Sequence, residues 1–259
     1  MNRHTKSHEI RIVFPQVLHF ESLPSTNQEL AQRAVAGAAE GLCVVAAEQT
    51  AGRGRLRRNW VSPKNAGLYF SILLRPQFAQ DSWPLLTLMA AVAVYDALLE
   101  TCGLQTDIKW PNDILANEKK LCGILAETIE TPTGRAVVIG IGVNLAKNSI
   151  LADLTPSATS VEAALGRACE VNQLLEVLVP VLSSQYETLQ RTGGPESIIR
   201  EWCARSSYGD GKLVQVAETN ELFTGTTRGL ERDGALRVET STGEIRFVRA
   251  GDVTSVRPG

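Results

Sequence analysis

Arginines crowd one short loop of this sequence, and they set the first expectation about its chemistry. Arg53, Arg55, Arg57 and Arg58 fall within six positions, and Gly54 separates the first two. Charges this dense repel one another unless an anion gathers them, and the guanidinium fork matches carboxylate and phosphate groups. Glycine also lets the backbone approach a ligand closely. Most charge runs are solvated surface, but the density and the glycine favour an anion-binding loop.

A second polar group stands at Lys109-Trp110-Pro111-Asn112-Asp113. Pro111 holds the residue before it in an extended conformation, so Asn112 and Asp113 are expected at a strand end or turn. Further on, Lys120 opens a mainly apolar strand. An ammonium there is either a snorkelling edge group or a buried functional charge, and the pattern alone favours neither.

Two further patterns are weaker. Gly140 and Gly142 alternate within an apolar run, so they point to one face of a strand and leave a flat floor there. They do not complete a dinucleotide-binding fingerprint, because no helix opens directly after them. Ser25-Thr26-Asn27 opens a helix, and helix capping alone explains it; Thr26 and Glu29 have the spacing of a capping box.

The composition excludes several classes of protein. The three histidines, His4, His8 and His19, lie in the first twenty residues, which leaves little for a His-based catalytic or metal centre. The net charge of −2 argues against a general nucleic-acid binder. Five scattered cysteines without a C-x-x-C pair indicate reduced thiols and a cytoplasmic location. The start lacks an apolar signal segment, and no apolar run approaches the roughly 20 residues of a membrane span. The remaining chemistry, on Lys, Arg, Asn, Asp and backbone groups, suits a reaction between anions.

The elements that must position these residues form a mixed pattern of strands and helices, followed by short β runs. A boundary is expected near 207–211, and about fifty residues of turn-punctuated β texture after it predict a small barrel. Pro180 is expected to kink its helix. The predicted strands are 17–20, 42–47, 68–74, 107–110, 113–116, 121–129 and 136–143; the predicted helices begin at 25 and 84 and span 160–165, 171–190 and 196–206.

Taken together and in this order, these segments closely resemble the biotin–protein ligases, which attach biotin to carboxylase carrier domains. The likeness covers about residues 18–205 and continues into the β tail. The matching pieces are Ser25-Thr26-Asn27, Gln49, Gly52-Arg53-Gly54-Arg55, Arg58-Asn59-Trp60, Lys109-Trp110-Pro111-Asn112-Asp113, Lys120-Leu121-Cys122-Gly123-Ile124-Leu125 with Glu127, and Gly140-Ile141-Gly142-Val143-Asn144.

The resemblance implies an α+β fold: a mixed β-sheet packed with helices, of the class II aminoacyl-tRNA synthetase-like biotin/lipoate ligase type, plus a C-terminal SH3-like barrel. It divides the chain into an N-terminal tail (1–15), a catalytic domain (16–208) and the SH3-like domain (209–259). It also implies two reaction steps: biotin and ATP with Mg²⁺ give biotinyl-5′-AMP, and a lysine of a biotin carboxyl carrier protein domain then takes the biotin.

The resemblance also assigns site residues. Lys120, Arg53 and Arg55 are the expected catalytic residues, with Lys120 the principal one, and Asp113 is a candidate contact of Mg²⁺. The expected biotin-binding residues are Ser25, Thr26, Asn27, Gln49, Arg53, Gly54, Arg55, Lys120, Gly140 and Gly142. The expected adenylate-binding residues are Arg55, Arg58, Trp60, Asn112, Asp113, Lys120 and Asn144.

The chain departs from the family pattern at Arg57, where the family usually has a third glycine in G-R-G-R-x-G-R. Only 24 residues precede Ser25, too few for the winged-helix domain of bifunctional members, so no DNA partner is expected. No membrane partner is expected either, whereas a homodimer and the identity of the carboxylases remain open. The alternatives are a lipoate– or octanoate–protein ligase of the same fold, which would need no polar set for a ureido group, and a non-enzymatic nucleic-acid binder using the arginines and the barrel. The balanced charge opposes the second.

Overall fold

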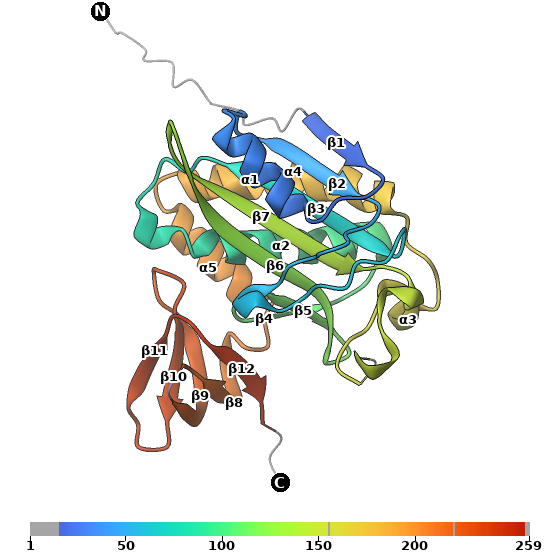
Figure 1. Ribbon diagram of the computed structural model, residues 1–259. Helices are drawn as coiled ribbons and strands as arrows, with labels where there is room; N and C mark the ends of the chain where they lie inside the picture. The colour runs from blue at the N-terminus through green and yellow to red at the C-terminus, as the bar shows by residue number, and fades with distance from the viewer. Residues whose placement is uncertain (1–15, 155, 220, 257–259) are drawn as a thin grey trace, which may run out of the picture.

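A seven-stranded sheet and a five-stranded sheet organise the protein (Figure 1). The computed structural model describes residues 16–154, 156–219 and 221–256; the predicted tail, residues 1–15, lies outside them. The large sheet has the order β1-β2-β3-β7-β6-β5-β4, and only the β1–β2 pair is parallel. Its strands are β1 (Gln16–Phe20), β2 (Leu42–Ala46), β3 (Gly67–Leu74), β4 (Asp107–Lys109), β5 (Asp113–Ala116), β6 (Lys119–Thr131) and β7 (Gly134–Asn144).

Helices cover both faces of the large sheet (Figure 1). On one face lies α1 (Thr26–Val35), whose Leu30 and Ala34 pack on Val44 and Val138 of the sheet. On the other lie α2 (Leu85–Cys102), α4 (Val171–Gln190) and α5 (Gly194–Ala204), over a much larger apolar interior. The short helix α3 (Val161–Leu165) follows β7. The alternating pattern of the strands therefore separates an α1 face from a core face.

The N-terminus of α1 corrects one expectation. Ser25 is the N-cap residue, and its side chain accepts no capping hydrogen bond. Glu29 pairs instead with Arg33 one turn further on, at 2.6 Å. The Thr26 hydroxyl lies 3.1 Å from Gln49 Oε1. The predicted capping box is wrong, because Thr26 is the first residue of the helix and not its N-cap, its hydroxyl contacts Gln49, and Glu29 pairs with Arg33 of the same helix.

Helix α2 corrects a second expectation, that no apolar run approaches the length of a membrane span. The segment Gln80–Cys102 has the length and mean hydropathy of a membrane span, so the apolar run is longer than the sequence analysis allowed. Two thirds of its most apolar window, 67%, is buried inside the protein. Contacts with α4, α5 and the sheet cover it. Burial in the core therefore accounts for the apolar composition of this helix.

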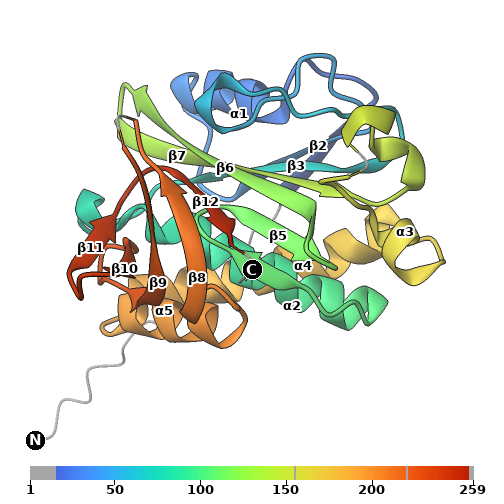
Figure 2. The same cartoon turned by 90° about the horizontal axis from the view of Figure 1, so that it is seen from below.

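The five-stranded sheet follows α5 and has the order β11-β10-β9-β8-β12, all antiparallel. Its interior joins the main core: Val214, Val216 and Leu236 belong to the same buried cluster as Trp202 of α5. Viewed from below, this small sheet lies against α5, with β12 beside β5 and β6 (Figure 2). Its strands are β8 (Asp210–Ala217), β9 (Leu222–Leu230), β10 (Leu236–Thr240), β11 (Ile245–Val248) and β12 (Asp252–Ser255).

One side chain joins the two sheets directly. Trp110 stands in the turn between β4 and β5, is 2% exposed, and donates from Nε1 to the carbonyl of Gly234 at 3.0 Å. The tryptophan of the Lys-Trp-Pro-Asn-Asp segment thus holds the small sheet against the large one.

Trp110→Phe should lower the free energy of unfolding by about 1–3 kcal/mol, because it removes a buried hydrogen bond and leaves the Gly234 carbonyl unpaired. Urea unfolding followed by circular dichroism measures the change. An unchanged midpoint would show that this hydrogen bond contributes nothing to the contact between the sheets.

Candidate active site

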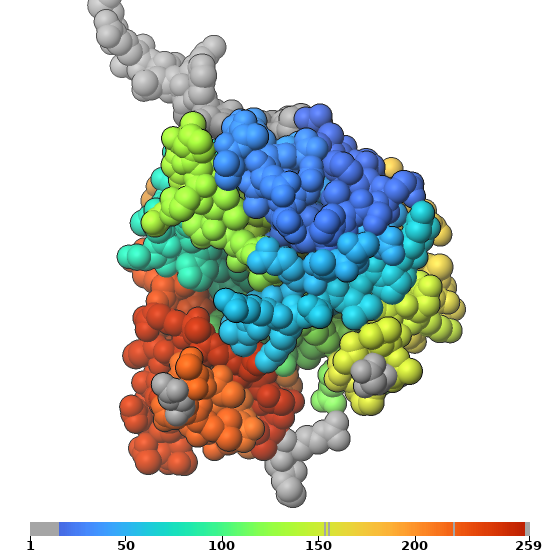
Figure 3. All heavy atoms as spheres, viewed as in Figure 1, coloured from blue at the N-terminus to red at the C-terminus, as the bar shows by residue number. Residues whose placement is uncertain are grey.

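A pocket of about 490 Å³ opens on the α1 face of the large sheet. Its walls are the start of α1, the loop between β2 and β3, the sheet itself and the strand β12 of the small sheet, together with Ser149, Ile150, Leu154, Ser157 and Ala158. The volume lies within the usual range of small-molecule sites. In the space-filling view the loop after β2, in cyan, lies between α1 in blue and the small sheet in orange and red (Figure 3).

The arginine loop is a tight hairpin built on glycine. Its arms are joined by the Trp60 N–H, which donates to the Gly52 carbonyl at 3.0 Å, and by the Gly54 N–H, which donates to the Arg58 carbonyl at 2.7 Å. A Cβ on Gly52 would lie 2.3 Å from the Trp60 carbonyl oxygen. The first glycine of the motif is therefore required for the close approach of the two arms.

The tip of the loop explains why Arg57 is unusual. Leu56 and Arg57 have φ values of 54° and 60°, in the left-handed region that favours glycine. Both side chains are exposed. A glycine at 57, as the family pattern has, would adopt this backbone without strain, so the substitution changes the backbone cost rather than a contact in the pocket.

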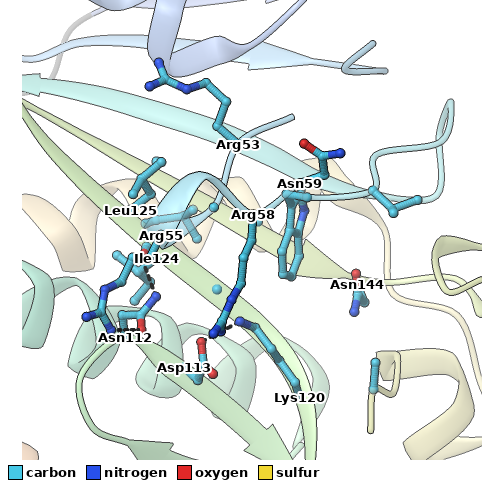
Figure 4. Close-up of a pocket in the computed structure, with 18 of the residues that line it drawn as sticks. Arg53, Arg55, Arg58, Asn59, Asn112, Asp113, Lys120, Ile124, Leu125 and Asn144 are labelled. Carbon is cyan, nitrogen blue, oxygen red and sulfur yellow. Dashed lines mark hydrogen bonds and ion pairs between the residues drawn. The ribbon is translucent and has the colours of Figure 1, made fainter. Parts of the chain in front are cut away.

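Arg53 does not point its charge at the pocket centre. Its Nη2 pairs with Glu127 Oε1 at 2.8 Å, and its side chain turns away from the other basic residues (Figure 4). Arg53 still lines the pocket, but its guanidinium is already neutralised by a carboxylate. This geometry does not place Arg53 where a catalytic cation is expected.

Lys120 and Arg55 are also held by acceptors. Lys120 Nζ lies 2.6 Å from Asp113 Oδ1 and 5.5 Å from the ring centre of Trp60. Arg55 Nη1 donates to Asn112 Oδ1 at 3.0 Å. Burial lowers the pKa of Arg55, and the nearby Asp252 and Asp113 oppose that shift. Since Asp113 is engaged with Lys120, it is not free to hold a metal in this arrangement.

Arg58 reaches across to the small sheet. It pairs with Asp252 of β12, a residue that also lines the pocket. Both side chains are largely exposed, so the pair adds little stability. Its consequence is geometric: the small sheet supplies part of the wall beside the basic residues, and this contribution has no local signal in the sequence.

Lys109 is a basic pocket residue that the sequence analysis quoted in a motif but did not assign. It is half-buried, and desolvation lowers its pKa, with Lys120 acting in the same direction and Asp113 opposing. Its position as the last residue of β4 aims it at the pocket. Tyr208, Asp252, Thr254 and Ser255 were missed too, because their nearness to the pocket depends on the packing of the small sheet.

The glycine floor exists, but protein side chains fill it. A Cβ on Gly140 would lie 2.2 Å from Asn27 Oδ1, and one on Gly142 would lie 2.5 Å from the Trp60 indole. Both glycines therefore make room for Asn27 and Trp60, whereas a bare floor under a ligand ring was expected. The Trp60 Nε1 is buried against Gly142 and has no hydrogen-bond partner among the described residues. Asn144, also expected in the site, lines the pocket and donates from Nδ2 to the Thr159 carbonyl at 3.2 Å.

The opposite end of the pocket is neutral and polar. Gln49 Oε1 accepts the Thr26 N–H at 2.9 Å, and Gln49 Nε2 donates to Ser62 Oγ at 2.9 Å. Thr26 and Asn27 are 3% and 5% exposed. Within the described residues, no group of three or more His, Cys, Asp or Glu side chains could hold a metal ion.

Comparison with known families agrees with this geometry. The biotin/lipoate A/B protein ligase family matches residues 19–144, and the biotin protein ligase C-terminal domain matches residues 211–254. The fold and the site thus define a ligase of the biotin/lipoate class.

Individual relatives narrow the class. The chain is 37% identical over 219 residues to the biotin–[acetyl-CoA-carboxylase] ligase of Paracoccus denitrificans, covering 82% of this chain and 89% of that one. It is 36% identical over 241 residues to the bifunctional ligase/repressor BirA of Bacillus subtilis, covering 92% of this chain and 73% of that one. The biotin protein ligase from Aquifex aeolicus in complex with biotin and ATP matches with a TM-score of 0.81 at 27% identity, over 94% of this chain and 99% of that one. The chain belongs to the biotin protein ligases and is an enzyme, a ligase.

Gly52→Ala should destabilise the loop, because the new methyl group overlaps the Trp60 carbonyl at a position where the backbone cannot yield. The expected loss is about 1–3 kcal/mol in the free energy of unfolding, together with faster proteolysis after the loop arginines.

Gly54→Ala is the matched control, since its Cβ would meet the Arg58 carbonyl oxygen at 3.3 Å and needs only a small adjustment. Equal losses in the two variants would contradict the close-approach explanation of Gly52.

Proposed function

We propose that this chain is a biotin–[biotin carboxyl-carrier protein] ligase working in two steps. In the first, a biotin carboxylate oxygen forms a bond to the α-phosphorus of ATP and pyrophosphate leaves, which gives biotinyl-5′-AMP. In the second, the amine of a carrier-domain lysine forms an amide with the biotin carbonyl carbon, and AMP leaves while the amine loses a proton. The observation that carries the proposal is one pocket with a neutral polar end and a basic end.

The polar end suits the ureido ring of biotin. A ureido group presents two N–H donors and one carbonyl acceptor, and hydroxyl and amide side chains can match both kinds. Ser25, Thr26 and Gln49 supply such groups in the walls. A linear fatty acid has no head group that would use them, which favours biotin over octanoate or lipoate.

The basic end suits the meeting of two anions. A carboxylate and an α-phosphate repel by about 4 kcal/mol when unit charges lie about 4 Å apart at an effective dielectric near 20. Lys109, Lys120, Arg55 and Arg58 line this end of the pocket. Preorganised cations stabilise charge that grows in the transition state. In the proposal Lys120 is the principal catalytic residue, Arg55 and Lys109 screen the reacting anions, and the adenylate lies towards Trp60, Arg58, Asn112 and Asn144.

ATP brings Mg²⁺ with it, and when bound this ion neutralises phosphate charge. Asp113 is the carboxylate that pairs with Lys120, and it would hold Mg²⁺ only after Lys120 turns from it to the substrate. The carrier is proposed to be the biotin carboxyl carrier domain of acetyl-CoA carboxylase, by the names of the Paracoccus and Mycobacterium tuberculosis relatives. The proposed compartment is the cytoplasm, where thiols such as the five free cysteines stay reduced.

Incubation of the purified chain with radiolabelled biotin, ATP, Mg²⁺ and a biotin carboxyl carrier domain tests the proposal. Acid-stable label should appear on the carrier and be lost when the target lysine of the carrier is replaced by arginine. Labelled octanoate, run in parallel, should give none. Transfer of octanoate without transfer of biotin would overturn the assignment in favour of the lipoate branch.

Lys120→Ala should reduce biotin-dependent ATP–pyrophosphate exchange by about 100-fold or more, because the missing cation faces growing transition-state charge. Lys119→Ala is a matched control: the same change at the neighbouring position, on the opposite face of β6, at a residue outside the pocket lining. If the exchange rate of the Lys120 variant stays within threefold of that of the control, Lys120 takes no part in the chemical step.

Lys109→Arg should extend the alkaline limb of the pH–rate profile for exchange to higher pH. The folded-state pKa of Lys109 is depressed by burial, so its charge is present below that pKa and is lost as pH rises through it, earlier than for an exposed lysine. Arginine keeps its charge throughout. The exposed Lys64→Arg serves as control, and an alkaline limb identical in all three proteins would show that Lys109 does not set it.

A further inference from the structure

Five polar side chains form a continuous chain of contacts from the arginine loop to the polar end of the pocket. Arg53 Nη2 and Asn27 Nδ2 approach the two oxygens of Glu127, at 2.8 and 2.9 Å. Ser71 Oγ lies 2.6 Å from Asn27 Oδ1 and 2.7 Å from Thr26 Oγ1.

The large sheet places these groups in one row. Ser71 of β3 and Leu125 of β6 are both in register with Gly140 of β7, and Glu127 follows two residues along β6. Residues two apart share a face, so Glu127 lies on the pocket face. Asn27 bridges from β3 to β6 over Gly140, in the space that a Cβ there would take.

The direction of each hydrogen bond follows from the chemistry of the partners. Glu127 Oε2 and the Leu125 carbonyl, 3.3 Å away, can only accept, so the Asn27 amide nitrogen must face them. Asn27 Oδ1 therefore faces Ser71, and the single Ser71 proton is given to it. The Ser71 oxygen can then only accept from Thr26. The Thr26 proton is directed to Ser71, at 2.7 Å, rather than to Gln49 Oε1, at 3.1 Å.

The result is a pair of acceptors in the pocket wall. Gln49 Oε1 is oriented by the Thr26 backbone N–H, and Thr26 Oγ1 has given its own proton away. Two hydroxyl protons serve three oxygen–oxygen contacts, of 2.6, 2.7 and 3.1 Å, and assigning them to the two shorter contacts leaves none between Thr26 Oγ1 and Gln49 Oε1. A ligand N–H donor placed against this pair reduces their repulsion and adds hydrogen bonds, whereas an apolar group leaves the repulsion in place and the remaining lone pairs unused in a buried place.

We propose that Glu127 is a positioning residue for recognition of the acid: through Asn27 and Ser71 it holds Thr26 Oγ1 as an acceptor, and so selects a head group that donates N–H bonds. This inference rests on the proposed function, in which that head group is the ureido ring of biotin. Glu127 itself does not line the pocket. It acts only by fixing which group donates and which accepts at each hydrogen bond between Asn27 and Thr26.

Glu127→Gln and Ser71→Ala test the proposal from opposite ends of the chain. A glutamine side chain can donate to or accept from the Asn27 amide, so it no longer fixes the orientation of that amide. Alanine at position 71 removes the acceptor for the Thr26 proton. Each variant should raise the Kd for biotin, measured by calorimetry without ATP, about tenfold, the effect expected from losing one well-placed hydrogen bond. The Kd for desthiobiotin, which keeps the ureido group, should rise by the same factor. KM for ATP and kcat for exchange should stay within about threefold of wild type.

The double variant and a surface control separate positioning from general damage. Because both changes break one chain, the double variant should bind biotin about as weakly as the weaker single variant, and not about a hundredfold more weakly than wild type. Glu130 lies on β6, the strand of Glu127, is 73% exposed and pairs with Arg135 of β7. Glu130→Gln removes this surface ion pair and should leave every constant unchanged. Thermal unfolding confirms that each variant is folded.

Three outcomes would overturn the inference: unchanged biotin affinity in both single variants, multiplicative losses in the double variant, or an equal rise in KM for ATP. Each requires that the wild-type chain carries out biotin-dependent exchange. A wild-type chain without that exchange would instead refute the proposed function, so the two failures are distinguishable.

Discussion

Mutual repulsion of basic side chains is the constraint around which this site is built. Five basic residues line one pocket. Four of them pair with an acceptor group that reduces the repulsion between the cations. Asp113 holds Lys120, Asn112 holds Arg55, Glu127 holds Arg53 and Asp252 holds Arg58. These partners come from two strands of the large sheet, the turn before one of them and the small sheet. Three of the four acceptors therefore come from the large sheet and its turn, and the packing of the small sheet adds the fourth, Asp252.

Close approach of backbone and side chains is the second requirement. Gly52 brings the two arms of the arginine loop together, while Gly140 and Gly142 admit Asn27 and the Trp60 indole to the surface of the sheet. Glycine in a strand interior weakens the strand in isolation. Here β7 is flanked by β3 and β6 along its length, so the sheet supports the two glycines, and the space that they leave becomes part of the pocket wall.

Much of the fold could be predicted from local patterns. The long helices 85–102 and 171–190 and the seven strands of the large sheet lie close to where hydrophobic periodicity and turn residues placed them. The mixed fold with a C-terminal β domain is confirmed. The failures have physical reasons. The Thr26 and Glu29 side chains have the spacing of a cap, but Thr26 contacts Gln49 and Ser71 from other elements, and Glu29 pairs with Arg33 in the same helix. The apolar length of α2 reflects burial of most of that helix in the core.

The sequence by itself determined the family and the general position of the pocket residues, because these depend on residue types at fixed spacings. Only the tertiary structure decided how the residues are used. Arg53 and Arg55 are two positions apart, yet one pairs with Glu127 and the other with Asn112. Asp252 and Tyr208 enter the pocket although the chain places them far from every motif. Hydrogen bonds and ion pairs depend on distance and direction in space, and partners separated by 74, 100 or 194 positions along the chain become neighbours only when the sheets have formed.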